Sequence, residues 1–358
     1  MPHPNIENAT AFVAEGLPLV DEHFAPVLTL VVKATFDIQP YGVLALAAEQ
    51  APLYTAGLLN HPDASTESSY RYEPEVAFCK PATDVVLVGH AHAPGGRATV
   101  MDVGFRVGPV HRAARVFGDR MWFRATGGIR LSAPVPFERM PIVYERAFGG
   151  WDHGGPTPSS EVRNPVGRGF VARTRELPEG LLAPNLELFD FPIQSVHDRP
   201  PPAGFGFVSP HWHPRMGLAG TYDQAWHGER APLLPLDFDR RHLNAASPGL
   251  VAPGFLVGDE RVLATGLSPE GRLDFRLPGL RAPTARVRLD DMSEHRPTLD
   301  LDTVIVDLDA RKLFMLWRAC VPTPGGPHRV TAIAYDCPDS KLLPRAEHQD
   351  IAGQAANC

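Results

Sequence analysis

The residues best suited to chemistry lie between positions 209 and 230, in the run SPHWHPRMGLAGTYDQAWHGER. His211 and His213 form an H-x-H pair, and in an extended segment both imidazoles would lie on one face. With Asp223 or His227 as a further ligand, such a pair could complete a three-ligand zinc or iron site. One hypothesis from this spacing is a metal-dependent hydrolase.

The alternative is that these histidines bind no metal. The chain has 15 histidines in 358 residues, which produces some H-x-H pairs by chance, and His90 and His92 form a second such pair. A metal site also needs acceptor groups around its ligands, and spacing does not reveal them. We therefore favour histidines without a metal.

Other catalytic and cofactor signatures are missing from the sequence. No G-x-S-x-G segment presents a nucleophilic serine, and Ser209 precedes a proline, which favours a turn. The segment GGIR lacks the spacing of a dinucleotide fingerprint, and no Gly-Lys-Ser/Thr follows NPVGRGF. We expect a protein without cofactor and without enzymatic activity.

Arginines accompany the glycine-rich segments ERAFGGWDHGG and RNPVGRGF. Arg146, Arg163 and Arg168 could form a pocket for a carboxylate, because a guanidinium binds a carboxylate with two hydrogen bonds. They could equally donate to loop carbonyls that no strand pairs, since buried backbone groups need partners. We favour this second, structural role.

Composition and periodicity predict an all-β or β-dominated fold with antiparallel strands in a sandwich-like or barrel-like arrangement. The 38 prolines and 32 glycines interrupt helices and favour turns. Long Pro/Gly-rich ordered loops and a few short helices should complete the fold. We expect one β-rich domain over residues 1–340, and any division into two packed β sub-domains would fall in 150–215. Residues 341–358 are expected to form a flexible tail.

Individual elements follow from local patterns. Residues 27–38 alternate polar and apolar side chains, which predicts a half-buried strand that returns through a hairpin. Residues 298–309 alternate aspartates with apolar residues, which predicts a solvated or edge-guarding strand face. Gly118–Asp119 is expected to form a hairpin turn. The short helix candidates are 46–51, 224–226 and 238–247.

Charge and targeting signals narrow the classes of partner. The formal net charge of −7 argues against nucleic acid, because phosphate binding needs a basic stripe. No apolar stretch of 18 residues predicts membrane insertion, and the N-terminus MPHPNIENAT shows no secretory signal. The four cysteines lack CxxC spacing and are expected to be reduced, so a cytoplasmic location is predicted.

In chain order, a set of longer motifs resembles a bacterial family, the domain of unknown function 2169. The matching segments are IENATAF near residue 6, TLVVKATFDI (29–38), CKPATDVVLVGHAHAPGG (79–96), VFGDRMWF (116–123), PFERMPIVYERAFGG (136–150), NPVGRGF (164–170), WHPRMGLAGTYDQAW (212–226), RAPLLPLDFDRRHLNAA (230–246) and DTVIVDLDARKLFMLWRA near the C-terminus. The resemblance covers roughly residues 5 to 335.

The resemblance implies an effector adaptor or chaperone of the type VI secretion system. Such a protein would bind a toxin with a PAAR (Pro-Ala-Ala-Arg repeat) domain and help load it onto the secretion spike, with the spike protein as a further partner. The family pattern stresses Trp212, Arg215 and the segment Ala219–Asp223, and it does not include His211, His213 or His227. The candidates for partner binding or loop organisation are Arg146, Trp151, Arg168, Trp212, Arg215, Tyr222, Asp223 and Trp226.

Three of these residues have specific expected roles. Asp223 should cap the short helix that begins near Gln224, and Arg215 should donate to loop carbonyls. Trp226 is expected to lie in the core, where truncation to alanine would cost about 3–5 kcal/mol.

A third hypothesis is a glycan-binding β module. It would use Trp122, Trp151 and Trp212 as stacking platforms. Such modules normally act outside the cytoplasm, so the absence of a signal peptide counts against this hypothesis.

Overall fold

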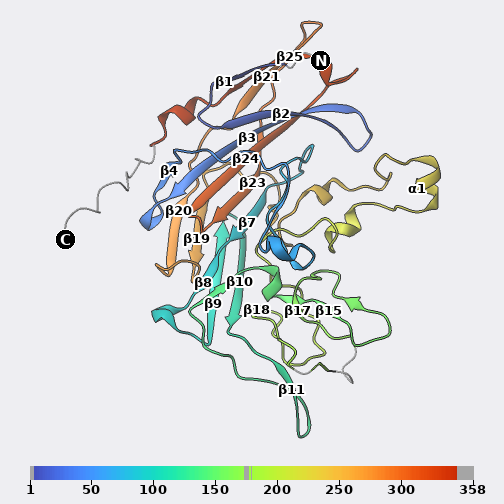
Figure 1. Cartoon of the computed structure of the whole chain (residues 1–358). Coiled ribbons are helices and arrows are strands. Elements are labelled where there is room, and N and C mark those ends of the chain that lie inside the picture. Colours follow the sequence, from blue (N-terminus) through green and yellow to red (C-terminus); the bar gives the residue numbers. More distant parts are fainter. Residues whose placement is uncertain (1–3, 173–176, 179, 345–358) are drawn as a thin grey trace.

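The computed structural model describes residues 4–172, 177–178 and 180–344. Strands dominate this part of the chain (Figure 1), which confirms the predicted β-dominated fold class. Sheets of six, five and four strands account for most of the structure, together with two-stranded ribbons. Each of the three larger sheets is open and most of their strand pairs are antiparallel, as sandwich-like packing requires.

The six-stranded sheet forms the centre of the molecule. Its strands, in spatial order, are β2 (Val13–Val20), β3 (Pro26–Ile38), β24 (Lys312–Pro322), β23 (Asp300–Asp307) and β7 (Asp84–Val88), with β4 (Leu44–Leu46) also paired to β3. The predicted hairpin β3–β4 is present, and β23 and β24 form a second antiparallel hairpin. Strands β23 and β7 pair in parallel, whereas the pairs β23–β24 and β24–β3 are antiparallel.

The strand at residues 27–38 is buried on both faces, so the half-buried prediction is wrong. Lys33 and Thr35, on its polar face, are 0% and 1% exposed. Lys33 Nζ contacts Glu75 at 2.8 Å, and Thr35 Oγ1 accepts from Ala51 N at 3.0 Å. The chain that follows β4 therefore covers this face and supplies polar partners.

Two aspartates of residues 298–309, Asp302 and Asp307, are likewise not solvated, which corrects the prediction of a solvated or edge strand face for them, whereas Asp300 and Asp309 are exposed. Strand β23 lies between β24 and β7, inside the sheet. Asp302 is 1% exposed and pairs with Arg318 at 2.5 Å, while Asp307 is 0% exposed and accepts from Arg71 at 2.7 Å. Alternation in sequence identifies a polar face but not what covers it.

The five-stranded sheet packs its apolar face into the same hydrophobic cluster as the central sheet. Its strands, in spatial order, are β18 (Leu186–Leu188), β10 (Val110–Phe117), β9 (Val100–Val107), β19 (Arg261–Thr265) and β20 (Arg272–Arg276). The chain turns between β9 and β10 at Gly108, which has a φ of +54°. Alternation along these strands leaves the opposite face exposed.

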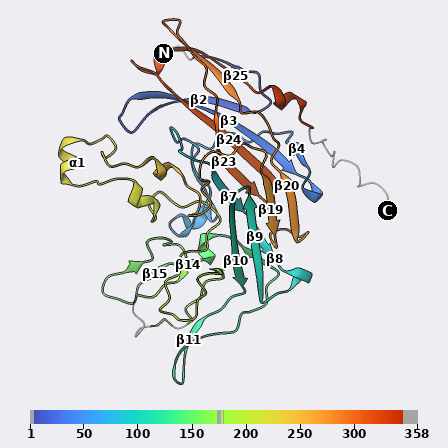
Figure 2. The ribbon, with the colours of Figure 1, turned by 180° about the vertical axis from the view of Figure 1, so that it is seen from behind.

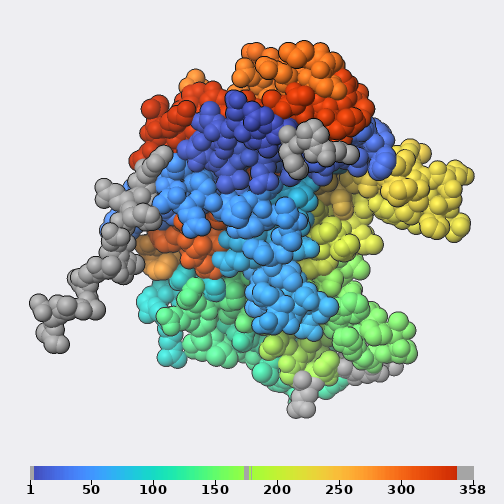
Figure 3. All heavy atoms as spheres, turned by 45° about the horizontal axis from the view of Figure 1, so that its top comes forward, coloured from blue at the N-terminus to red at the C-terminus, as the bar shows by residue number. Residues whose placement is uncertain are grey.

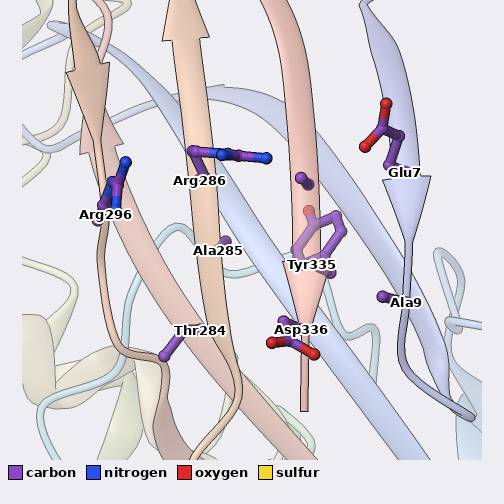
Figure 4. A pocket seen from close by; sticks show the side chains of 9 residues that line it. Glu7, Ala9, Thr284, Ala285, Arg286, Arg296, Tyr335 and Asp336 are labelled. Carbon is purple, nitrogen blue, oxygen red and sulfur yellow. The ribbon is translucent and has the colours of Figure 1, made fainter. Parts of the chain in front are cut away.

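The four-stranded sheet lies at the end of the molecule that carries the N-terminus (Figure 1). Its strands are β1 (Asn5–Asn8), β25 (Val330–Asp336), β21 (Thr284–Leu289) and β22 (Glu294–His295). Its outer face is hollowed into a shallow trough of about 520 Å³. Glu7, Arg286, Arg296 and Asp336 surround this trough, and Ala9 and Ala285 lie among them (Figure 4).

Short two-stranded ribbons fill the irregular regions. They are β5 (Leu58–Leu59) with β6 (Tyr70–Tyr72), β8 (His90–His92) with β13 (Arg139–Pro141), β11 (Trp122–Ala125) with β12 (Gly128–Leu131), β14 (Phe148–Gly149) with β17 (Arg168–Gly169), and β15 (Trp151–Asp152) with β16 (Ser159–Ser160). The predicted hairpin turn at Gly118–Asp119 is wrong. The chain there passes from β10 to β11, which turns back only at Gly127–Gly128.

Helices are few and short among the described residues. The α-helix α1 (Gln224–Glu229) confirms the candidate at 224–226. Short 3-10 helices occur at Pro40–Gly42, Pro62–Glu67, Pro94–Gly96, Tyr144–Arg146, Arg215–Leu218, Arg240–Leu243, Pro327–Arg329 and Pro338–Leu342. The candidate at 238–247 therefore reduces to one short turn. The candidate at 46–51 is wrong, because Ala47 N and the Gln50 amide both bond to Thr35 of β3 instead.

One large hydrophobic cluster holds the sheets together and includes buried residues from Phe12 to Cys337. Two smaller clusters lie beneath the central loops, one around Trp122 and Phe148 and the other around Tyr144 and Trp212. No helix in the described ranges is long and apolar enough to cross a membrane. Of the predicted tail, residues 345–358 lie outside the described residues.

Candidate partner-binding site

The segment 216–241, called the arm below, leaves the sheets and projects from the side of the molecule. It carries α1, which stands clear of the strands from both directions of view (Figures 1 and 2). A space-filling view shows the same segment protruding beyond the surface of the molecule (Figure 3). The arm includes residues 216–230, which are most of the run 209–230 that suggested a metal site.

Buried Arg215 closes the base of the arm. Its Nε donates to His242 O at 2.6 Å, and its Nη1 donates to Val208 O at 2.8 Å and to the Glu73 carboxylate. In return, His242 Nδ1 donates to Arg215 O at 2.9 Å. The two ends of the arm are thus tied to each other, and the predicted role of Arg215 as a donor to loop carbonyls is confirmed.

The charges at this base lie in a poorly solvated setting. Burial raises the pKa of Glu73 despite the opposing charge of Arg215. Burial and the Arg215 charge also lower the pKa of His242, although its bond to the Arg215 carbonyl opposes this. The base of the arm therefore favours the neutral form of His242.

A second anchor joins the end of the arm to β7. Asp84, at the start of this strand, is fully buried and accepts from Asn244 Nδ2 at 3.0 Å and from Ala245 N at 2.9 Å. Lys80 Nζ pairs with the same carboxylate at 2.8 Å. The chain that follows the arm is therefore anchored on the central sheet, whereas Arg215 ties the beginning of the arm to Glu73 and to the carbonyls of Val208 and His242.

Inside the arm, the two chain directions are held close together. Gly220 has a φ of +88°, and a Cβ there would lie 2.7 Å from Pro235 Cβ. Asp237 accepts from Thr221 N at 2.9 Å and from Thr221 Oγ1 at 2.7 Å. Glycine is required at position 220 both for its backbone conformation and for this close approach.

The tip of the arm is organised by α1 and its cap. Asp223 Oδ1 accepts from Trp226 N at 2.8 Å, which confirms the predicted N-cap. Trp226 Nε1 donates to Leu233 O at 2.8 Å, and its ring meets Tyr222 edge-on with centroids 4.6 Å apart. Trp226 is only half-buried, so its predicted core position is wrong. Its contacts stabilise the arm itself rather than the sheets.

Apolar side chains remain exposed along the arm. Met216 and Tyr222 are each 52% exposed, and Leu236 is 83% exposed. Next to the base lies an open hollow of about 410 Å³, lined mainly by apolar groups that include Pro214, Leu218 and Val251. Exposed apolar groups on a braced projection are a typical feature of protein interaction sites.

Comparison with known proteins identifies the family. Residues 23–318 match DUF2169, a family described as an uncharacterized protein conserved in bacteria. The chain belongs to the DUF2169 family. No curated protein and no solved structure matches it.

In this DUF2169 protein, the segments 79–84, 212–226 and 230–246 meet at the arm and its base. Lys80 and Asp84 come from the first, Arg215 from the second and Asn244 from the third. The first segment is far from the other two in sequence, and the fold brings it to them. Three of the motifs that carry the family resemblance therefore meet at the anchoring of the arm.

The arginines of the other glycine-rich segments form a separate polar network. Arg146 Nη1 donates to Asp119 at 2.9 Å, Arg168 Nε donates to Glu145 O at 2.9 Å, and Arg168 Nη1 donates to Asn185 at 3.2 Å. Arg163 binds Glu161 with two hydrogen bonds of 2.7 and 2.8 Å. These donors bind groups of the chain itself, which supports the structural role over a carboxylate pocket.

The three tryptophans of the glycan hypothesis do not form a common surface. Trp122 and Trp212 are 2% and 7% exposed, and Trp212 packs edge-on against Tyr144 at 5.4 Å. Only Trp151, on β15, is exposed, at 51%. Two of the three rings are therefore not accessible for stacking against a sugar.

The histidines of the metal hypothesis are not grouped as metal ligands in the described part of the chain. His211, His213 and His227 are exposed, and within the described part of the chain no three His, Cys, Asp or Glu side chains are placed to hold a metal ion. In the second H-x-H pair, His90 Nδ1 contacts Asp309 Oδ1 at 2.8 Å. Its neighbour His92 has a pKa lowered by burial, with Arg139 contributing.

Sequence reasoning missed Glu73 and Asp84, the buried acids that hold the arm. A signal for Asp84 was present, because an aspartate directly before the apolar run VVLV should be either a strand-end cap or a buried anchor. Glu73 had no comparable signal, since its partner Arg215 lies 142 residues away in the chain.

Proposed function

We propose that this protein is a non-enzymatic adaptor, or chaperone, that binds a toxin carrying a PAAR domain. It would help load that toxin onto the spike of the type VI secretion system in the cytoplasm. The motif resemblance described above suggests this role. The observation that supports it best is the projecting arm.

The geometry of the arm suits capture of a folded partner. Its base is braced by buried ion pairs, so little conformational entropy is lost when a partner binds. Its surface presents Met216, Tyr222 and Leu236 to solvent, and exposed side chains of this kind serve as anchors in protein interfaces. An arm held apart from the sheets can also lie along a partner surface without displacing core contacts.

The test is co-purification with a PAAR-domain toxin after co-expression. The double variant Tyr222→Ala/Leu236→Ala removes two exposed side chains from the arm and should abolish or strongly reduce recovery of the toxin. A matched control is Tyr41→Ala/Met292→Ala, which removes an aromatic and an aliphatic side chain that are 92% and 74% exposed elsewhere. The control should retain the toxin, and both variants should melt like the wild type.

The adaptor role would be wrong if deletion of the protein left both toxin level and toxin delivery unchanged in cells. The role of the arm alone would be wrong if the wild type retained the toxin and the arm variant retained it equally well. These two results are distinguishable because the first concerns the protein and the second concerns one of its surfaces.

A further inference from the structure

A second surface, remote from the arm in sequence, is carried by the five-stranded sheet. The inner face of this sheet is fixed by apolar residues such as Val103, Phe105 and Val262, which join the large hydrophobic cluster. Because side chains alternate along a strand, the other residues of β9, β10, β19 and β20 must face outward. No choice of register could turn this outer set inward without exposing the core.

The outer set carries an excess of positive charge. Its charged members on these four strands are Arg106, Arg115, Arg261, Arg272 and Arg276 with Asp102 and Asp274, while Glu187 of β18, opposite Arg115, is 5% exposed and paired with Arg120. Five arginines against two aspartates give a formal charge of +3, with exposed His111 counted as neutral, on a chain whose net charge is −7. Solvated sheet faces usually mix the two signs more evenly. This face is therefore of opposite sign to the chain as a whole.

Three of these arginines already bind carboxylates within the chain. Arg115 holds Asp102 with hydrogen bonds of 2.8 and 3.3 Å, and Arg261 holds Asp274 with bonds of 2.7 and 2.5 Å. Arg272 contacts the same Asp274 carboxylate at 2.9 Å. The face thus shows, with its own residues, the paired hydrogen bonds that a guanidinium makes to a carboxylate.

The other two arginines of this face, Arg106 and Arg276, donate to backbone carbonyls rather than to carboxylates. Arg106 Nε donates to Gly108 O at 2.7 Å, and Arg276 Nη1 donates to Asp259 O at 3.0 Å. Both side chains are exposed. Between them and Arg115 the register places Gly104 and Ala113 side by side, so the centre of the face is flat and an approaching backbone could come close.

We propose that this outer face is a docking surface for an acidic segment of a protein partner. The carboxylates of that segment bind Arg106 and Arg276, whose own hydrogen bonds within the chain go to backbone carbonyls. A protein segment fits better than nucleic acid, because Asp102 and Asp274 interrupt the positive charge that a continuous phosphate backbone requires. The proposal does not depend on the identity of the partner or on the role of the arm.

The experiment uses the full chain and poly-L-glutamate as the acidic probe. Binding should be measurable at low ionic strength and should weaken as salt is added. The variant Arg106→Glu/Arg276→Glu should lose about tenfold in affinity or more, because two attractions become repulsions. The control Arg286→Glu/Arg296→Glu changes the net charge equally on the four-stranded sheet (Figure 4) and should bind like the wild type.

Three results would overturn the proposal. They are equal loss in both variants, no salt-sensitive binding of poly-L-glutamate by the wild type, and tighter binding of duplex DNA than of poly-L-glutamate. Circular dichroism and melting of each variant show that it is folded. If poly-L-glutamate binding follows the expected pattern but no PAAR-domain toxin co-purifies, the adaptor function fails while this surface stands.

Discussion

Arg215 and Glu73 illustrate how single buried charges position a functional element. Their side chains are each 10% exposed, so both charges have left most of their water. Transfer of charges from water is costly, but removal of only one partner costs more because the other charge stays buried and unpaired. Lys33 with Glu75 and Arg318 with Asp302 repeat this arrangement on the covered face of the central sheet.

The variant Arg215→Ala should be destabilised by about 3–5 kcal/mol. It leaves the Glu73 carboxylate and the carbonyls of Val208 and His242 without this donor. Urea denaturation measures the change. Arg241→Ala is the control, because Arg241 is 71% exposed and pairs with partly exposed Asp239, which predicts a much smaller loss. Equal loss in the two variants would contradict this account.

A second residue-scale prediction concerns pH. Burial alone would raise the pKa of Glu161, but the hydrogen bonds from Arg163 hold it below its ordinary value. At pH values between the folded and the unfolded pKa of Glu161, the unfolded chain therefore binds more protons than the folded chain. The stability contributed by Glu161 is therefore present above its unfolded pKa and is lost as pH falls through its folded pKa.

The variant Glu161→Gln tests this sign. The unfolding free energy of the wild type, measured from neutral pH down into the acid range, should fall more steeply than that of the variant below about pH 4.5. The variant should be less stable at neutral pH, and the two curves should converge in acid. Parallel curves would show that Glu161 contributes nothing through this ion pair.

At the scale of elements, the arm behaves as a unit attached to the sheets at its two ends. Its internal contacts, from Thr221 to Asp237 and from Trp226 to Leu233, stay within the arm. Arg230 and Arg240 also contact Glu22 in the turn between β2 and β3, but α1 itself has no buried residue. Local opening of such an element needs less free energy than global unfolding.

The cap of α1 should therefore control local opening without affecting global stability. Asp223→Ala removes the acceptor of Trp226 N and should cost the helix about 1 kcal/mol. Hydrogen exchange of the α1 amides should become faster, while the urea midpoint of the whole protein stays unchanged. Asp223→Asn keeps a capping oxygen and serves as the control. A lowered global midpoint in Asp223→Ala would mean that the arm and the core unfold together.

Tryptophan truncations distinguish the arm from the core. Trp317 is 1% exposed in β24, so Trp317→Ala should lose about 3–5 kcal/mol. Trp226→Ala should lose far less in global unfolding, because Trp226 packs against Tyr222 within the arm. Thermal melting of the two variants side by side measures this difference. Equal melting temperatures would place Trp226 in the cooperative core after all.

At the scale of the whole molecule, three sheets share one hydrophobic cluster and leave different surfaces available. The arm extends from β7 and its neighbouring loops, and the arginine-bearing face lies on the five-stranded sheet. The adaptor proposal concerns the first surface, and the docking of an acidic segment concerns the second. A combined variant, Tyr222→Ala/Leu236→Ala with Arg106→Glu/Arg276→Glu, should lose toxin recovery as the arm variant does and poly-L-glutamate affinity as the arginine variant does if the surfaces act independently.

Local patterns sufficed for the parts of this protein that depend on near neighbours. The hairpins β3–β4 and β23–β24, the short helix α1 and its Asp223 cap follow from alternation, turn residues and capping chemistry within a few positions. The β-dominated class follows from the same signals repeated along the chain.

Tertiary structure decided what the polar residues face. Asp302 and Lys33 alternate like solvent-facing residues, yet packing covers them and supplies Arg318 and Glu75 as partners. The same holds for the run from 209 to 230, whose histidines suggested a metal site. Its defining contact is Arg215 with Glu73, a residue 142 positions away. Spacing along a chain reports which groups share a face, whereas burial and distant partners depend on how the sheets pack.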